Sequence, residues 1–209
     1  MTPMSSDSTL PDLILASGSP RRRTILRELN VLFDAHTVEI DESPLAGESP
    51  QALVSRLSIA KAEAASAPGV LVLAADTIVA LDGESLGKPT SPAVAREMLG
   101  RLVGREHTVY TGVALHSADI GKTVGDIEAS KVRLGPMNEQ DIDWYIATGE
   151  PLDKAGSYAI QGLGSLFVAE ISGNYSNVVG LPMPLTQSLF KTLGFDLRQF
   201  LSTDLQNTI

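Results

Sequence analysis

The sequence predicts an α/β protein in which a mixed central sheet is flanked by helices. Short apolar runs alternate along the chain with amphipathic segments of helical period, as they do in α/β domains. The dipeptide Asp82-Gly83 between two extended runs is typical of a tight hairpin, so the sheet is not expected to be purely parallel. A length of 209 residues indicates a single domain, which we expect over residues 13–209, after a flexible tail over residues 1–12.

The first half of the chain is expected to form two strands and two helices. The apolar run over residues 13–17 predicts a buried strand that ends at Gly18. Ser19-Pro20 and Ser49-Pro50 each predict a helix start, because serine is favoured at the N-cap and proline at the first helical position. The second helix ends before Pro68-Gly69, and the almost wholly apolar run over residues 70–81 predicts a central strand.

The second half of the chain is expected to complete the sheet and its helical cover. Ser91-Pro92 begins a third helix that ends near Gly104, and Gly149 ends a fourth. The remaining expected elements are two paired strands over residues 107–117 and 126–134, a strand over residues 165–171 and a last amphipathic helix over residues 184–194.

The composition excludes several classes of protein and site. The chain has no cysteine, which excludes disulfides, thiolate zinc sites and cysteine nucleophiles and suits the reducing cytoplasm, where we expect the protein. Its 16 basic and 25 acidic residues give a net charge of −9, which argues against nucleic-acid binding. No apolar run approaches the ~20 residues that span a membrane, and the N-terminal segment lacks the basic and apolar regions of a secretory signal.

A candidate anion site lies where the first strand meets the first helix, in the run Ser17-Gly18-Ser19-Pro20-Arg21-Arg22. A helix N-terminus presents free N–H groups and the positive end of the helix dipole, so it attracts anions. Arginine is unfavourable at such a helix start unless an outside anion binds it, and its forked donors suit phosphate. The alternative is a surface helix start with solvated arginines.

Carboxylates at two places are candidates for metal binding or base catalysis. Asp76 stands within an apolar strand, where an unpaired carboxylate is costly, so a functional role is favoured over the alternative of a salt bridge to a nearby lysine or arginine. Asp41 and Glu42 lie in a predicted loop and gain weight only if the fold brings them near Asp76. Clustered carboxylates of this kind form a site of the Mg²⁺ type, which a substrate phosphate completes.

Two lysines complete the candidate set. Lys61 lies on the apolar stripe of its helix, where the alternative is snorkelling at the helix edge, and Lys88 follows the hairpin. The three histidines lack metal-ligand spacing and are expected to be structural. Gly162-Leu163-Gly164 is too weak a pattern for a dinucleotide site, and the sequence has neither a Walker A motif nor a Gly-x-Ser-x-Gly elbow.

Seven short motifs follow one another along the chain. They are Ala16–Arg22, Asp41-Glu42, Ala60-Lys61-Ala62, Ala75-Asp76-Thr77, Gly87-Lys88-Pro89, Pro151–Gly164 (PLDKAGSYAIQGLG) and Asn177–Pro182. In order and spacing they resemble the Maf family of nucleoside triphosphate pyrophosphatases, and the resemblance spans nearly the whole chain. It implies a Maf/ITPase-like fold and a metal-dependent hydrolase that cuts a nucleoside triphosphate between the α and β phosphates, giving a monophosphate and pyrophosphate.

The resemblance also implies roles for individual residues. Asp76 matches the family's catalytic acid, described as the proton acceptor. Arg22, Thr77 and Gln161 match three positions associated with base preference, in a combination similar to the subgroup that acts on dTTP and UTP; modified pyrimidine nucleotides are further candidate substrates. The sister subgroup, which acts on 7-methyl-GTP, has glutamine and glutamate in place of Thr77 and Gln161.

Physical chemistry agrees with these roles. Glu42 and Asp76 would hold Mg²⁺ or Mn²⁺, and Asp76 would orient or deprotonate the attacking water. The phosphates would be bound by Ser19, Arg21 and the helix N-terminus, while Lys61 and Lys88 would balance the charge of the departing pyrophosphate. Gln161 offers both a donor and an acceptor to a pyrimidine edge.

Two alternatives remain at this point. One, linked to the family, is a nucleotide-binding regulator of septum formation and cell division without essential catalysis. The other is an interaction module whose arginine-bearing helix docks on an acidic partner. The resemblance further implies a homodimer, and we expect a nucleoside triphosphate substrate as the partner, without nucleic acid or membrane.

Overall fold

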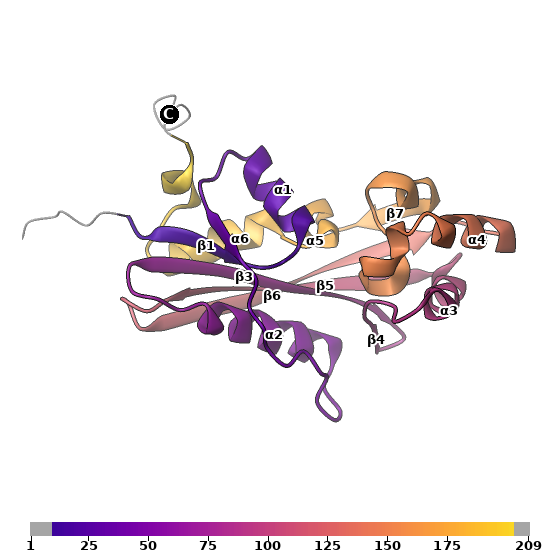
Figure 1. The fold of residues 1–209 in the computed structure, drawn as a ribbon, viewed down its shortest axis with the longest axis horizontal. Coiled ribbons are helices and arrows are strands. Elements are labelled where there is room, and N and C mark those ends of the chain that lie inside the picture. The colour runs from indigo at the N-terminus through magenta and orange to yellow at the C-terminus, as the bar shows by residue number, and fades with distance from the viewer. Residues whose placement is uncertain (1–9, 203–209) are drawn as a thin grey trace, which may run out of the picture.

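The structure, a computed structural model, describes residues 10–202. One sheet contains the strands β1 (Asp12–Ala16), β2 (Asp34–His36), β3 (Val70–Leu81), β4 (Glu84–Leu86), β5 (Glu106–Ser117), β6 (Lys122–Leu134) and β7 (Val168–Ser172). Their order is β2-β1-β3-β5-β6-β7, with β4 paired to β3 outside this path. β1 is parallel to β2 and β3, and all other pairs are antiparallel, so the predicted mixed sheet is confirmed (Figure 1).

Helices cover both faces of this sheet. The α-helices of the described residues are α1 (Pro20–Glu28), α2 (Pro50–Ala64), α3 (Pro92–Leu102), α4 (Glu139–Ala147), α5 (Tyr175–Val179) and α6 (Met183–Thr192), and the 3-10 helices are η1 (Glu150–Asp153), η2 (Ala155–Ser157), η3 (Gly162–Phe167) and η4 (Leu197–Phe200). In Figure 1, α2 lies on one face, α1, α5 and α6 lie on the other, and α3 and α4 gather at the end of the sheet near β4. None of the helices in residues 10–202 is long and apolar enough to cross a membrane.

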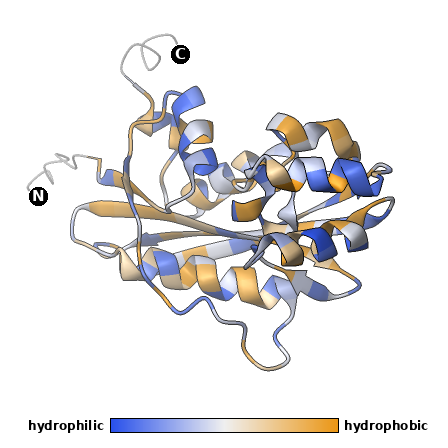
Figure 2. Ribbon diagram, turned by 45° about the vertical axis from the view of Figure 1, so that its right-hand side comes forward, coloured by the Kyte–Doolittle hydropathy of each residue, from blue (hydrophilic) through white to orange (hydrophobic). Residues whose placement is uncertain are grey.

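Apolar side chains pack on both faces of the strands, which carry much of the hydrophobic colour in Figure 2. Leu26 of α1 and Phe190 of α6 are fully buried against β1, β3 and β5 on one face. Val54 of α2 is fully buried on the opposite face, beside Ile78 of β3. A separate cluster around Leu99 of α3 forms a core at the β4 end of the sheet. The chain therefore has a large lobe and a smaller one, joined by the long strands.

Gly112 of β5 permits the close approach of α2 to the sheet. A Cβ atom built at this position would lie only 2.3 Å from the backbone oxygen of Val54. Gly112 is also the register partner of Asp76, so the helix crosses the sheet beside that carboxylate. Lys61 follows Val54 by two helical turns and therefore lies on the same face of α2.

The local signals in the sequence agree with the structure at several element ends. The hydroxyls of Ser49 and Ser91 cap α2 and α3 by accepting from backbone N–H groups three residues later. The turn at Asp82-Gly83 has φ angles of 53° and 84°, the positive values that a type I′ hairpin requires. Gly149 follows α4 with φ 78°, as a C′ glycine should.

Several boundaries differ from those expected. β1 begins at Asp12, one residue inside the expected tail, because its N–H donates to the carbonyl of Gly69 at 3.0 Å. The helix α5 and the three-residue strand β2 were not expected, since both are too short to show a period. The expected strand over residues 165–171 begins only at Val168, because η3 precedes it. The rest of the expected tail, residues 1–9, and residues 203–209 lie outside the described part of the chain.

Candidate active site

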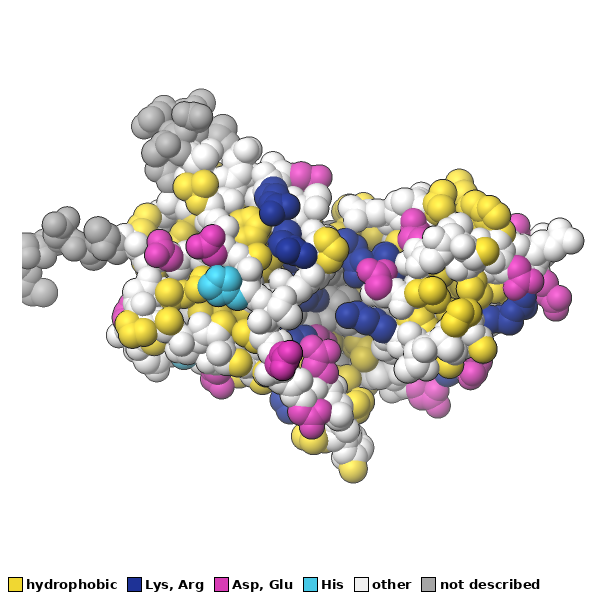
Figure 3. Space-filling model, in the orientation of Figure 1, with side chains coloured by type: hydrophobic (Ala, Val, Ile, Leu, Met, Phe, Trp, Pro, Cys, Tyr) yellow, Lys and Arg dark blue, Asp and Glu magenta, His cyan; other side chains and the backbone are white. Residues whose placement is uncertain are grey.

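A cavity of about 570 Å³ opens at an interruption in the sheet. On this side of β3, β1 pairs only as far as Leu73 and β4 pairs only from Val79. Residues 74–78 therefore have β5 on one side and the cavity on the other, between the two lobes. Figure 3 shows the hollow at the centre of the molecule, with basic side chains around it.

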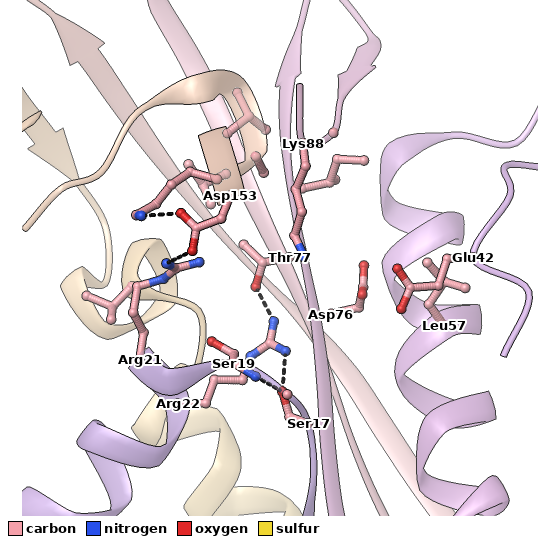
Figure 4. Close-up of a pocket in the computed structure, with 18 of the residues that line it drawn as sticks. Ser17, Ser19, Arg21, Arg22, Glu42, Leu57, Asp76, Thr77, Lys88 and Asp153 are labelled. Atoms are coloured by element: carbon pink, nitrogen blue, oxygen red, sulfur yellow. Dashed lines mark hydrogen bonds and ion pairs between the residues drawn. The ribbon is translucent and has the colours of Figure 1, made fainter. Parts of the chain in front are cut away.

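All nine site residues expected from the sequence line this cavity. They are Ser19, Arg21, Arg22, Glu42, Lys61, Asp76, Thr77, Lys88 and Gln161. Figure 4 labels seven of them, which approach from the start of α1, from the loop before α2, from β3 and from the segment after β4. Lys61 comes from α2, and Gln161 directly precedes η3. The fold thus brings together residues that are far apart in the sequence.

The N-terminus of α1 faces the cavity with free hydrogen-bonding groups. Ser19 is the N-cap, but its side chain makes no capping hydrogen bond, and the first turn contains no acidic residue. Its hydroxyl and the helix end are therefore available to an anion. Arg21 reaches Asp153 of η1, with Nη1 3.6 Å from Oδ2.

Arg22 is bound mainly by the protein itself. Its side chain donates to the carbonyl of Gly180 at 2.7 Å, to Ser17 Oγ at 3.0 Å and to Thr77 Oγ1 at 2.9 Å. Burial lowers the pKa of Arg22, while the charge of Asp76 acts in the opposite direction. An outside anion was the expected reason for arginine at this helix start; for Arg22, internal acceptors use three of its five N–H donors.

Asp76 and Glu42 meet at a single ammonium group. Adjacent residues of a strand point to opposite faces, so Thr77 faces α1 while Asp76 faces α2. Lys61 Nζ lies 2.6 Å from Asp76 Oδ1 and 2.7 Å from Glu42 Oε1. The two acids are therefore close together, as expected, and the alternative of a salt bridge at Asp76 is also present.

Lys61 lowers the pKa of Glu42. Burial alone would raise the pKa of Glu42, but the hydrogen bond and charge of Lys61, with smaller effects of Lys88 and Arg22, hold it below its ordinary value. The Lys61 side chain is 11% exposed, which makes it a core-facing ion-pair partner rather than a snorkelling side chain. Both carboxylates are thus compensated before any ligand binds.

Asp41 does not join this pair. It is absent from the cavity lining, and its Oδ1 accepts from the backbone N–H of Ser43 at 2.9 Å, which turns the carboxylate into its own loop. Of the two loop acids, the fold therefore brings Glu42 and not Asp41 to Asp76. Across residues 10–202, no group of three or more His, Asp or Glu side chains has the arrangement of a metal site.

The cavity lining is positive although the whole chain is negative. Its basic residues outnumber its acids by five to three, whereas the chain has a net charge of −9. The five are Arg21, Arg22, Lys61, Lys88 and Lys154, and the three are Glu42, Asp76 and Asp153. A polyanion such as a triphosphate tail suits this lining.

Two of these charged residues were not among the site residues expected from the sequence. Asp153 and Lys154 stand in the motif over Pro151–Gly164, which supplied only Gln161 to the candidate set. Lys154 Nζ donates to the carbonyl of Glu150 at 2.9 Å and contacts Asp153. Their adjacent opposite charges within that motif were the signal that could have found them.

The histidines occupy other positions, as expected. His107 is buried, and its Nε2 is hydrogen-bonded to Tyr158 Oη at 2.7 Å. His116 contacts Ser66 and Thr123 with its two ring nitrogens. Neither histidine lines the cavity, and the same is true of His36.

The profile of the Maf-like protein family matches residues 12–193. This chain belongs to the Maf family. The family expected from the seven motifs is therefore confirmed, and the matched region contains every residue of the candidate site.

Similar curated proteins carry the name dTTP/UTP pyrophosphatase. The one from Symbiobacterium thermophilum is 47% identical and covers 90% of this chain and 97% of its own length. Those from Myxococcus xanthus and Moorella thermoacetica are 46% and 48% identical over 93% and 88% of this chain, and over 97% and 96% of their own lengths. Among solved structures, the Ham1 protein of Staphylococcus aureus aligns with 94% of this chain and 97% of its own, at a TM-score of 0.42 and 15% identity.

Proposed function

We propose that this Maf protein hydrolyses dTTP and UTP to the nucleoside monophosphate and pyrophosphate. The observation that carries the proposal is the positive cavity at the open edge of β3, where Asp76 and Glu42 meet. The name dTTP/UTP pyrophosphatase, which similar curated proteins carry, supplies the substrates. Water adds across the bond between the α and β phosphates, so no second substrate is needed.

A divalent cation is part of the proposal. The donor set fits one, because Mg²⁺ is commonly bound by one or two carboxylates, substrate phosphates and waters rather than by a full protein cage. Glu42 and Asp76 would hold it. When bound, the cation, Mg²⁺ or Mn²⁺, supplies neutralisation of phosphate charge.

Residues of the cavity also activate the water, bind the phosphates and neutralise the leaving group in this proposal. Asp76 orients the attacking water and accepts its proton. The Ser19 hydroxyl, the N-terminus of α1 and Arg21 bind phosphate oxygens, and Lys88 balances the charge of the departing pyrophosphate. Lys61 shares that task once the phosphates compete with the carboxylates for it.

The base binds toward Gln161 in this proposal. Gln161 lines the cavity on the side of η3, and its amide does not cap that helix, so it can pair with a pyrimidine edge. Arg22 and Thr77 are hydrogen-bonded to each other. They therefore act on base preference by shaping the wall of the cavity, rather than by donating hydrogen bonds to the base. Activity on modified pyrimidine nucleotides, a homodimer, a cytoplasmic location and the lack of nucleic-acid binding stay predictions.

Product identification tests the proposal. Purified protein is incubated with UTP or dTTP and Mg²⁺, and the products are identified by ³¹P NMR; a monophosphate and pyrophosphate are expected. Arms with CTP, GTP and 5-methyl-UTP measure base preference, and an arm with EDTA measures the metal requirement. A nucleoside diphosphate with orthophosphate would contradict the proposed bond, and nucleotide binding without product would favour the regulator.

A further inference from the structure

The half-buried carboxylate of Glu150 lies outside the cavity, and the proposed chemistry does not use it. Glu150 begins η1 and accepts three hydrogen bonds. Tyr145 Oη and the N–H of Gly164 both donate to Oε1 at 2.8 Å, and the N–H of Leu163 donates to Oε2 at 3.0 Å. Burial would raise the pKa of Glu150, but these donors hold it below its ordinary value, so the group is an anion at neutral pH.

The same network continues into the cavity wall through a tyrosine. Tyr145 is 1% exposed, and its hydroxyl accepts from the N–H of Ala159 at 3.0 Å while it donates to Glu150. Ala159 lines the cavity, and so does Gln161. Gln161 therefore lies between two anchored points, two residues after Ala159 and two before Leu163, and both points lead back to one carboxylate.

Glycines leave the space that this network needs. A Cβ atom at Gly162 would lie 2.4 Å from Glu150 Oε2, and the φ of 66° there favours glycine. A Cβ atom at Gly164 would lie 2.3 Å from the carbonyl oxygen of Ala159 and 2.5 Å from Tyr145 Oη. The Gly-Leu-Gly motif, too weak for a dinucleotide site, thus permits close approach to Glu150.

We propose that Glu150 is a positioning residue that selects the nucleotide base by fixing the backbone on both sides of Gln161. It acts without touching the substrate, and the inference rests on the proposed function for the identity of that substrate. A carboxylate is required because all three of its partners are donors, and a glutamine amide would direct its own NH₂ group at one of them. The Glu150 carboxylate accepts from Tyr145, Leu163 and Gly164, none of which belongs to α1, α2 or β3, the elements that carry Arg21, Lys61 and Asp76.

The test compares two probes that separate the base end from the phosphate end. Glu150→Gln is titrated with the α,β-imido analogue of UTP and with inorganic tripolyphosphate by calorimetry. We expect the Kd of the analogue to rise about tenfold, since a charged hydrogen-bond network is broken, while that of tripolyphosphate changes by less than about twofold. The preference for the uridine over the guanosine analogue should fall, and with UTP as substrate KM should rise more than kcat falls.

Controls keep the inference falsifiable. Glu139→Gln, an exposed glutamate of the same helix as Tyr145, should leave both titrations unchanged. If Glu150→Gln fails to fold by circular dichroism, Tyr145→Phe, which removes both bonds of the hydroxyl, is measured under the same criteria. The inference would be overturned if Glu150→Gln kept the wild-type affinity for the UTP analogue and the wild-type base preference. It would also be overturned if the affinities for the UTP analogue and for tripolyphosphate fell by the same factor. A wild-type protein that binds the analogue but forms no pyrophosphate would overturn the proposed function alone.

Discussion

Lys61 occupies the position between two carboxylates that would otherwise repel each other. Its ammonium contacts Asp76 and Glu42 at 2.6 and 2.7 Å, and the side chains of Lys61 and Asp76 are 11% and 14% exposed. Removing one partner of a well-buried ion pair leaves an uncompensated charge, which costs about 3–5 kcal/mol. A divalent cation that binds these two acids, as proposed, would therefore have to displace the ammonium group of Lys61.

Replacing Lys61 should consequently raise the affinity of the free protein for a divalent cation. We expect Lys61→Gln to bind Mn²⁺ at least about tenfold more tightly than wild type, because two unpaired carboxylates attract the ion. Electron paramagnetic resonance of free Mn²⁺ measures the affinity without any turnover. Lys88→Gln is the matched control, since it removes an equal charge from the same cavity lining. Equal Mn²⁺ affinities in the two variants would refute the competition.

His107 makes the stability of the fold depend on pH. Burial lowers its pKa from 6.5 to about 4, only partly offset by the backbone of Arg105 and the charge of Glu106. As the pH falls, His107 is protonated in the unfolded chain before it is protonated in the folded protein. The contribution of His107 to the free energy of unfolding is therefore fully present above about pH 6.5 and is lost as the pH falls toward 4.

The loss due to this one group should be about 3 kcal/mol. His107→Gln can still bond to Tyr158 but does not titrate, so it should lack that part of the decline. Urea unfolding of both proteins at several pH values provides the comparison. If the free energy of unfolding fell with pH equally in wild type and His107→Gln, His107 would not be the cause of the decline.

At the scale of elements, the placement of α2 on β5 sets the distance between Lys61 and Asp76. The helix backbone passes Gly112 so closely that a Cβ atom would lie 2.3 Å from the carbonyl oxygen of Val54. Asp76 is paired with Gly112 across β3 and β5, and Lys61 lies two turns beyond Val54 on the same helix face. Any side chain at position 112 must therefore push α2 away from β5 and β3.

Gly112→Ala should destabilise the protein by about 1–3 kcal/mol, as overpacked cores generally are, and lower the rate of nucleotide hydrolysis as well. Gly100→Ala is a matched control in α3, where a Cβ atom would meet no atom within 4 Å, and should be neutral or stabilising by up to about 1 kcal/mol. Urea unfolding and steady-state kinetics give both quantities. Wild-type stability in Gly112→Ala would show that α2 is not held by this contact.

Local signals predicted the elements that have a period or a cap and missed those that depend on distant contacts. Ser49, Ser91 and Gly149 mark helix ends in the sequence and in the structure alike. Residues 165–167 do not begin the expected strand, because they belong to η3, whose first turn is held by Glu150 through the N–H groups of Leu163 and Gly164. Such a contact has no local signature.

For the whole molecule, the site was predictable as a set of residues but not as a network. The cavity gathers all nine expected residues, since their motifs keep the spacing of the Maf family. The hydrogen bonds of the individual side chains were not predicted. Arg22 donates to Thr77 instead of remaining available to an outside anion. Asp41 accepts a hydrogen bond within its own loop and stays out of the cavity. The Arg22–Thr77 bond joins residues 55 positions apart, which no local pattern shows, whereas the Asp41 bond is a turn within one loop.

The charge of the whole chain and the charge of its cavity have opposite signs, and this affects substrate capture. The chain has a net charge of −9, while basic residues predominate around the cavity. Raising the salt concentration from about 0.05 to about 0.5 M should therefore increase KM for UTP several-fold and change kcat little, because screening weakens attraction of the triphosphate more than the enclosed chemistry. A salt-independent KM in initial-rate measurements would argue against electrostatic capture.

Asp76→Asn tests most directly whether Asp76 accepts the proton, because substrate binding and turnover can be measured separately in this variant. If Asp76 accepts the proton of the attacking water, the variant should form pyrophosphate from UTP about 10³-fold more slowly while binding UTP within about tenfold of wild type. Asp34→Asn, an exposed aspartate of the same sheet, should behave as wild type. Turnover by Asp76→Asn within tenfold of wild type would contradict the account.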